Sequence, residues 1–168
     1  MDIATTDTKV DNGAIEANRH GVTRSPEWSR VELEHRKLQP YCICCGVESE
    51  DKVAIQVHHL FPFHYCINLG RPDLELDQRN LISLCEDEKN RPSQDHHLLI
   101  GHLDSFKSSN LSAAIDAQQV FIGLTREQII ANDLWKTKVT SRLKPLDQMT
   151  DEDKQNFINL MNTTFPKL

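Results

Sequence analysis

The first regular pattern of hydrophobic positions begins near residue 28. Four residues recur at intervals of three and four, as on one face of a helix: Trp28, Val31, His35 and Leu38. Ser25 precedes them as a suitable N-cap, with Pro26 at the first helical position. Pro40 cannot continue the helix and ends the pattern. The spacing predicts a helix that packs this face on a core.

Two short apolar runs and a second helical stretch follow. Residues 53–57 read as a strand that ends at the pair His58 and His59, and residues 80–85 read as a second strand. A polar loop then leads to a predicted helix over residues 96–106. The middle of the chain therefore has the order strand, strand, helix, which is an α+β pattern.

The two ends of the chain differ from this middle segment. Residues 1–24 show no periodicity and are predicted to form a disordered tail before a domain at 25–110. Residues 111–168 read as a helical extension, with Thr125 opening a capping box and Thr150 capping a last helix. The extension carries no cluster of reactive side chains, so we expect it to pack on the domain or to bind a protein partner.

Composition narrows the class of protein. No apolar stretch approaches the ~20 residues needed to cross a bilayer, and the polar, acidic N-terminus does not resemble a signal peptide. We therefore expect a soluble, cytoplasmic protein without membrane contact. The net charge of −6 opposes nucleic-acid binding, although a bound divalent cation would add positive charge where a phosphate must lie.

The cysteines form a metal-ligand pattern. There are five, an odd number, and three of them fall within four positions, which is a poor disulfide framework and indicates a reducing compartment. Cys42 and Cys45 form a C-x-x-C pair followed by Gly46, which permits the tight turn that brings two thiolates to one tetrahedral ion. Cys85 and His96 supply a second pair. The sequence predicts a structural Zn²⁺ on these four side chains.

Two cysteines remain outside the predicted zinc site. Cys66 is expected to pack as a small apolar residue. Cys44 lies inside the turn, and it replaces one member of the pair if the turn is shifted. The alternative to a zinc site is that all these thiols are ordinary buried side chains and His96 lies on the surface.

Histidines form a second group. His58 and His59 are successive residues at a strand end, so they point to opposite sides and can serve two different roles. His97 and His102 lie in the predicted helix, and Asn80 opens the second strand. Histidines gathered around a cysteine framework favour a reactive site over a set of unrelated surface residues.

This combination resembles the HNH endonuclease family, in particular its stand-alone bacterial and phage members. The resemblance covers roughly residues 25–110 and rests on the order of five motifs: Ser25-Pro-Glu-Trp28, Cys42-x-x-Cys45-Gly46, Val57-His58-His59, Asn80-Leu-Ile-Ser-Leu-Cys85 and the closing histidines. It implies an α+β fold with a ββα-metal core, a zinc knuckle, an N-terminal helix and a C-terminal helical extension.

The resemblance also implies roles for individual residues. His59 corresponds to the general base, and His58 to a ligand of the catalytic metal. Asn80 corresponds to the residue that holds the loop between the strands and orients the base. The last histidine of the motif binds the catalytic metal, and His97 is favoured over His102. These two residues are five positions apart, about 140° around an α-helix, so both are not expected to face one ion.

The function implied is metal-dependent hydrolysis of DNA phosphodiester bonds. A neutral histidine suits the base, and an imidazole-rich site accepts Mg²⁺, Mn²⁺, Ni²⁺ or Zn²⁺. Four basic residues are candidates for phosphate contacts: Arg71, Arg79, Arg91 and Lys107. The alternative function is a non-catalytic zinc module that binds nucleic acid or protein, and a secreted toxin nuclease is a third. The substrate's sequence and strandedness and the oligomeric state stay open.

Overall fold

A two-stranded antiparallel sheet lies at the centre of the described chain. The computed structural model describes residues 21–48 and 53–168, in which β1 (Ala54–His59) pairs with β2 (Leu81–Glu86). Ala54 lies opposite Glu86, and His59 lies opposite Leu81. Both predicted strands are confirmed, each displaced by one or two residues. With the helices around the sheet, the fold is mixed α and β.

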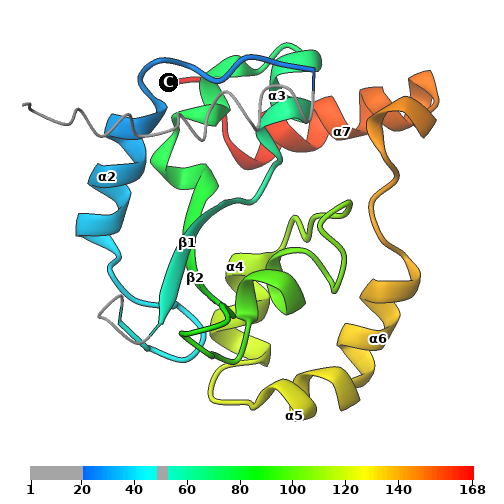
Figure 1. The fold of residues 1–168 in the computed structure, drawn as a ribbon. Coiled ribbons are helices and arrows are strands. Elements are labelled where there is room, and N and C mark those ends of the chain that lie inside the picture. The colour runs from blue at the N-terminus through cyan, green and yellow to red at the C-terminus, as the bar shows by residue number, and fades with distance from the viewer. Residues whose placement is uncertain (1–20, 49–52) are drawn as a thin grey trace, which may run out of the picture.

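The helix α2 (Trp28–Leu38) lies against this sheet, as Figure 1 shows. Val31 and His35 are buried as the periodicity predicted. Leu38 was also expected to face the core, but 73% of it is exposed. The helix ends at Leu38 because the next residue, Gln39, turns back and bonds Ser83 of β2 through its backbone and side chain.

The chain before α2 is packed from Arg24 onward. The first twenty residues of the predicted tail lie outside the described residues. Arg24, which the sequence analysis assigned to that tail, instead lies over the rings of Trp28 and Phe63, at 4.2 and 4.1 Å from their centroids. Ser25 does not cap α2 as predicted. The helix begins at Trp28, and the hydroxyl of Ser25 accepts from the amide of Glu27, the residue before the helix.

The connection between the strands, to which the sequence patterns assigned no helix, contains helical structure. It consists of α3 (Phe63–Asn68) and two short 3₁₀ turns, η1 (Pro72–Glu75) and η2 (Gln78–Asn80). Pro62 immediately precedes α3, and Gly70 follows it with a φ of +82°, a conformation that favours glycine. These two residues are the start and stop signals of a helix.

After β2 the chain forms a short π-helical turn, η3 (His97–Gly101), where a helix over 96–106 was predicted. The helix is shorter because Leu103 and Asp104 adopt left-handed backbone angles, with φ of 51° and 63°. The turn η3 packs against both strands, and β2 in particular.

The C-terminal segment is helical, as expected. Both predicted caps are present, since Thr125 and Thr150 each form a capping box. In Figure 1, α5 and α6 lie across the sheet from α2, and α7 runs beside α3. The elements in order are α4 (Ala113–Ile115), the π turn η4 (Asp116–Val120), α5 (Arg126–Ala131), α6 (Asp133–Thr140), the 3₁₀ turn η5 (Leu146–Gln148) and α7 (Asp151–Thr164).

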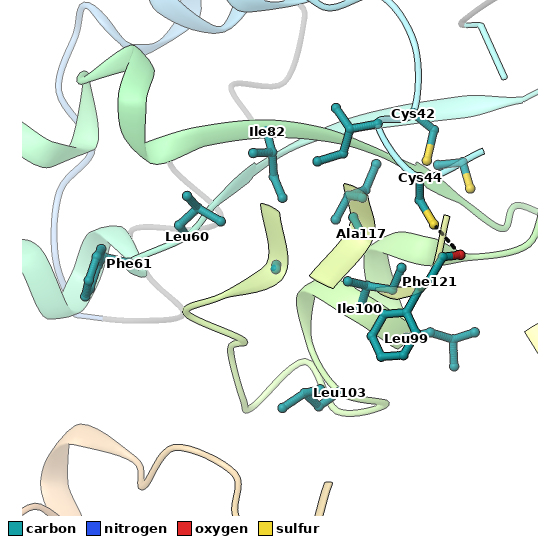
Figure 2. Close-up of a cluster of buried hydrophobic side chains, with 14 of the residues drawn as sticks. Cys42, Cys44, Leu60, Phe61, Ile82, Leu99, Ile100, Leu103, Ala117 and Phe121 are labelled. Atoms are coloured by element: carbon teal, nitrogen blue, oxygen red, sulfur yellow. Dashed lines mark hydrogen bonds between the residues drawn. The ribbon is translucent and has the colours of Figure 1, made fainter. Parts of the chain in front are cut away.

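One hydrophobic core joins this segment to the rest of the fold. Figure 2 shows Phe121 and Ala117 among side chains of η3 and β2, and Phe61 contacts the ring of Phe157 from α7. The C-terminal helices therefore complete the core on which the central sheet packs. Within the described residues, no helix combines the length and apolar character that a membrane crossing requires.

Candidate functional site

Four predicted zinc ligands converge on one point. The sulfurs of Cys42 and Cys85 each lie 3.5 Å from Nδ1 of His96, and the sulfurs of Cys45 and Cys85 are 4.0 Å apart. The edges of a tetrahedral zinc site with these ligands measure about 3.6 Å (sulfur to nitrogen) and 3.8 Å (sulfur to sulfur). The donor set and its spacing therefore fit a structural Zn²⁺, and we call these four residues the Cys₃His cluster.

The turn that carries two of the ligands has the predicted geometry. Gly46 has a φ of +72°, and its amide donates to the carbonyl of Cys42 over 2.8 Å. The amide of Ile43 donates to the carbonyl of Ser83, which ties the turn to β2. The glycine thus permits the tight turn, because an L side chain rarely adopts this φ.

The two remaining cysteines lie outside the Cys₃His cluster. Cys44 is 2% exposed and donates to the backbone carbonyl of Phe121 over 3.3 Å, as drawn in Figure 2. Cys66 is fully buried and donates to the carbonyl of Phe61 over 3.5 Å. Burial raises the pKa of both thiols, that of Cys66 to about 12. The contact with Phe121 directs the Cys44 thiol to the core, and the four residues whose ligand atoms converge do not include it.

A second cluster contains three of the predicted catalytic histidines. His58, His97 and His102 each offer a ring nitrogen, and these nitrogens all lie within 4.8 Å of one another. Nε2 of His97 and Nε2 of His102 are 3.2 Å apart, and the centroid of the His58 ring is 5.4 and 4.8 Å from theirs. Two nitrogens bound to one ion at about 2.1 Å are separated by about 3.0–3.4 Å. We call these residues the His₃ cluster.

The expectation that His97 and His102 would not face one point was wrong. It assumed an α-helix, in which five residues turn about 140° beyond one full turn. The turn is π-helical, and the amide of His102 donates to the carbonyl of His97 over 3.2 Å, a bond between residues five apart. The wider turn brings the two side chains onto the same face, so both join His58.

Hydrogen bonds orient the rings of His97, the first residue of η3, and of His102, the residue that follows η3. Nδ1 of His97 donates to Oε1 of Glu86 over 3.1 Å, and Nδ1 of His102 donates to the carbonyl of Ser108 over 2.7 Å. The hydrogen bond from His97 lowers the pKa of Glu86, so the carboxylate is ionised. Each imidazole that donates from Nδ1 carries a lone pair on Nε2. Two lone pairs that face each other over 3.2 Å repel unless a cation or proton lies between them.

The third histidine, His58, also has a ring nitrogen that is available to a metal ion. His58 is 4% exposed, and its Nε2 is buried without a hydrogen-bond partner among the described residues. Burial, followed by the nearby His102 and His97, holds the pKa of His58 well below 6.5, so the ring is neutral. Gly101 leaves room for it, because a Cβ there would lie 3.1 Å from the ring. A neutral imidazole with an unpaired buried nitrogen is a suitable metal ligand.

Side chains of the C-terminal segment support the turn η3. Nε1 of Trp135, in α6, donates to the carbonyl of Leu99 over 2.8 Å. The guanidinium of Arg142 donates to the carbonyl of Leu103. A π turn disrupts the regular helical bonding, and these donors satisfy carbonyls that would otherwise lack partners. This support was not predicted, because the segment carries no cluster of reactive side chains to indicate it.

His59 points to the opposite face of β1, as the strand geometry predicted. Its ring lies 4.6 Å from that of Trp28, and Nε2 donates to the carbonyl of Glu75 over 2.9 Å. Nδ1 therefore carries the lone pair. Burial, followed by the charge of Arg24, lowers the pKa of His59 to about 3, so the ring is neutral near pH 7.

Asn80 holds the segment around His59. It is fully buried, its Oδ1 accepts from the amide of Phe61 over 2.7 Å, and its Nδ2 donates to the carbonyls of Phe61 and Leu74. Phe61 lies two residues after His59, and Leu74 lies one residue before Glu75, the acceptor of the His59 bond. Asn80 thus fixes the loop between the strands.

His58 and His59 both line a hollow of about 390 Å³, which we call the histidine hollow. Its wall includes Arg24, which the sequence analysis missed, and Lys107. The other three candidates for phosphate contacts lie elsewhere and are ion-paired: Arg71 with Asp73, Arg79 with Asp77 and Arg91 with Glu88. Arg71 is 2% exposed, so its role is structural.

The comparisons with known proteins give no match. No protein-family model matches this chain, and neither does any curated protein or solved structure. The two clusters and the hollow are therefore the features of the molecule that bear on its function.

Proposed function

We propose that this protein is a metal-dependent nuclease of the HNH type, which hydrolyses phosphodiester bonds of DNA. One observation carries the proposal: the His₃ cluster and the neutral His59 lie on opposite faces of one strand end and line the same hollow. Phosphodiester hydrolysis needs a metal-binding group and a base at one reaction centre. In this proposal β1, β2 and η3 correspond to the ββα-metal core, with a π turn in place of the start of its helix.

The three histidines suit a catalytic metal by their number and chemistry. Three protein ligands leave coordination positions for water and substrate, as in catalytic zinc sites, whereas four thiolate and imidazole ligands close a structural site. Imidazole nitrogen accepts Zn²⁺, Ni²⁺ and Mn²⁺, and Mg²⁺ binds such a set more weakly. A divalent ion there would stabilise the charge on the phosphate and on the leaving oxygen.

The remaining chemistry falls to side chains of the chain. Nδ1 of His59 accepts a proton from the attacking water, while the carbonyl of Glu75 holds the other ring nitrogen and stabilises the protonated ring. The charge of a bound phosphate raises the pKa of His59 from about 3 toward the range that suits a base. Asn80 positions the base through the loop that it holds.

A plasmid cleavage assay tests the proposal. Wild-type protein and the variant His59→Ala are incubated with supercoiled plasmid and Mg²⁺, Mn²⁺, Ni²⁺ or Zn²⁺, and with EDTA as the metal-free control. We expect metal-dependent cleavage by the wild type and a loss of at least ~100-fold in the variant. Zinc content and circular dichroism establish that the variant is folded.

The same assay separates the enzyme from the alternative. A folded, zinc-loaded wild type that cleaves neither the plasmid nor a single strand of DNA under any of the four metals would contradict the nuclease proposal. The non-catalytic zinc module then becomes the better explanation of the fold.

A further inference from the structure

A second hollow adjoins the histidine hollow. It measures about 730 Å³ and shares three wall residues with the first: His64, Tyr65 and Lys107. It extends past α3 to η5 and the start of α7, where Lys154 lines it. We call it the lysine hollow. A polymer whose scissile bond lies at the His₃ cluster can continue along this second hollow.

An exposed aromatic ring stands next to the His₃ cluster. Phe106 lines the histidine hollow, and its ring centroid is 4.9 Å from that of His102 and 5.8 Å from that of His97. It is 46% exposed despite these contacts. Single exposed apolar residues are common on proteins. A partly open phenyl ring that packs on two metal-site imidazoles is, in addition, a platform on which an unpaired base can stack.

The basic side chains along the two hollows suit a single strand better than a duplex. Among the described residues of their walls, the arginines and lysines are Arg24, Lys107 and Lys154, and Arg24 forms an ion pair with Glu75. A protein that holds a duplex commonly neutralises about six to ten phosphates. Two lysines on a chain of net charge −6 supply far fewer contacts, so stacking has to contribute much of the affinity.

We infer that the substrate is single-stranded nucleic acid, with a base stacked on Phe106 and the backbone led past Lys107 to Lys154. This inference rests on the proposed nuclease function and specifies its substrate. Bases within a duplex already stack on their neighbours, so Phe106 can reach a base only where the strand is unpaired.

Binding of labelled oligonucleotides tests the inference. Fluorescence anisotropy is measured with a 20-nucleotide DNA strand, its duplex and the RNA strand of the same sequence, using the full-length His59→Ala variant to prevent cleavage. We expect the single strand to bind at least ~10-fold more tightly than the duplex. The DNA and RNA arms show whether the 2′-hydroxyl matters.

Two pairs of variants in the same background locate the contacts. Phe106→Ala should weaken single-strand binding about tenfold or more, whereas Phe106→Trp should retain it. Lys154→Ala should reduce the slope of log Kd against log salt by about 0.7, while Lys136→Ala, on the exposed side of α6, should leave it unchanged. Equal or tighter duplex binding, or full affinity in Phe106→Ala, would overturn the inference.

A cleavage assay with the wild type distinguishes failure of the nuclease proposal from failure of the single-strand inference. Metal-dependent cleavage of the duplex at the rate of the single strand would contradict the substrate inference and leave the nuclease standing. Tight single-strand binding that depends on Phe106, without any cleavage, would contradict the nuclease and leave a single-strand binding module. Failure to bind either nucleic acid would overturn the inference outright.

Discussion

The Cys₃His cluster and the His₃ cluster are built on the two neighbouring strands and one shared segment, residues 96–97, and differ in chemistry. Strand β2 supplies Cys85 to one, β1 supplies His58 to the other, and the neighbours His96 and His97 divide between them. The first cluster has four thiolate and imidazole groups, three of them fully buried, a donor set that fits a closed zinc site. The second has three nitrogens on the wall of a hollow. Because His96 and His97 are adjacent, we expect a metal in the first cluster to fix the segment that carries His97.

The largest expected effect is the loss of the closed cluster. Cys85→Ser removes a buried thiolate, and a structural zinc contributes on the order of 10 kcal/mol of binding free energy that is coupled to folding. We expect the variant to lose zinc and its cooperative thermal transition. Measurement of zinc content and of Tm in the presence and absence of EDTA checks this expectation.

His97→Ala is the matched control for that experiment. It removes a ligand from the open cluster one residue away from His96, so it should retain zinc and a cooperative transition while losing the second metal. A control variant that unfolds like Cys85→Ser would show that the two clusters do not differ in role.

A smaller effect is expected at Trp135, which acts on the open cluster from α6. Trp135→Phe keeps an aromatic ring but removes the donor to the carbonyl of Leu99. We expect a loss of about 1–2 kcal/mol in the free energy of unfolding, and affinity for Ni²⁺ at the His₃ cluster lower by about tenfold. Calorimetric titration of zinc-loaded protein measures the second quantity. Unchanged Ni²⁺ affinity would show that Trp135 contributes to packing and not to metal binding at the His₃ cluster.

The smallest expected effect is a pH dependence of stability at His59. Its folded pKa of about 3 lies below the unfolded value of 6.5, so the unfolded chain binds the proton first as pH falls. The contribution of the neutral His59 to the free energy of unfolding is therefore complete above pH 6.5 and is lost as the pH falls from 6.5 to 3. When the pH is lowered from 7 to 5.5, the free energy of unfolding of the wild type should fall by about 1 kcal/mol more than that of His59→Gln. Urea denaturation at both pH values measures the difference, and parallel losses would contradict the assignment.

The sequence predicted the ligand chemistry better than the backbone that carries it. The C-x-x-C-Gly spacing and Cys85 identified the Cys₃His cluster, because metal-ligand spacing is a local property. The position of His102 relative to His97 could not be predicted, since a π turn has no periodicity signal distinct from that of an α-helix. Tertiary donors such as Trp135 stabilise this turn, and they come from a distant segment.

Two other omissions have different physical causes. The helix α3 was missed although Pro62 and Gly70 mark its ends, because six residues give too short a pattern for helical periodicity. Arg24 was assigned to the tail because its partners, the rings of Trp28 and Phe63, lie together only in the folded chain. Contacts between segments far apart in sequence are not visible in local patterns.

Stepwise removal of metal tests most directly the claim that the two clusters are of different kinds. Protein loaded with Zn²⁺ and Co²⁺ is titrated with a chelator while metal content, circular dichroism and DNA cleavage are followed together. The account predicts two metal ions per chain, with the more weakly bound one leaving first and taking cleavage with it while the fold remains. A single bound metal, or unfolding that accompanies the first ion released, would contradict the account.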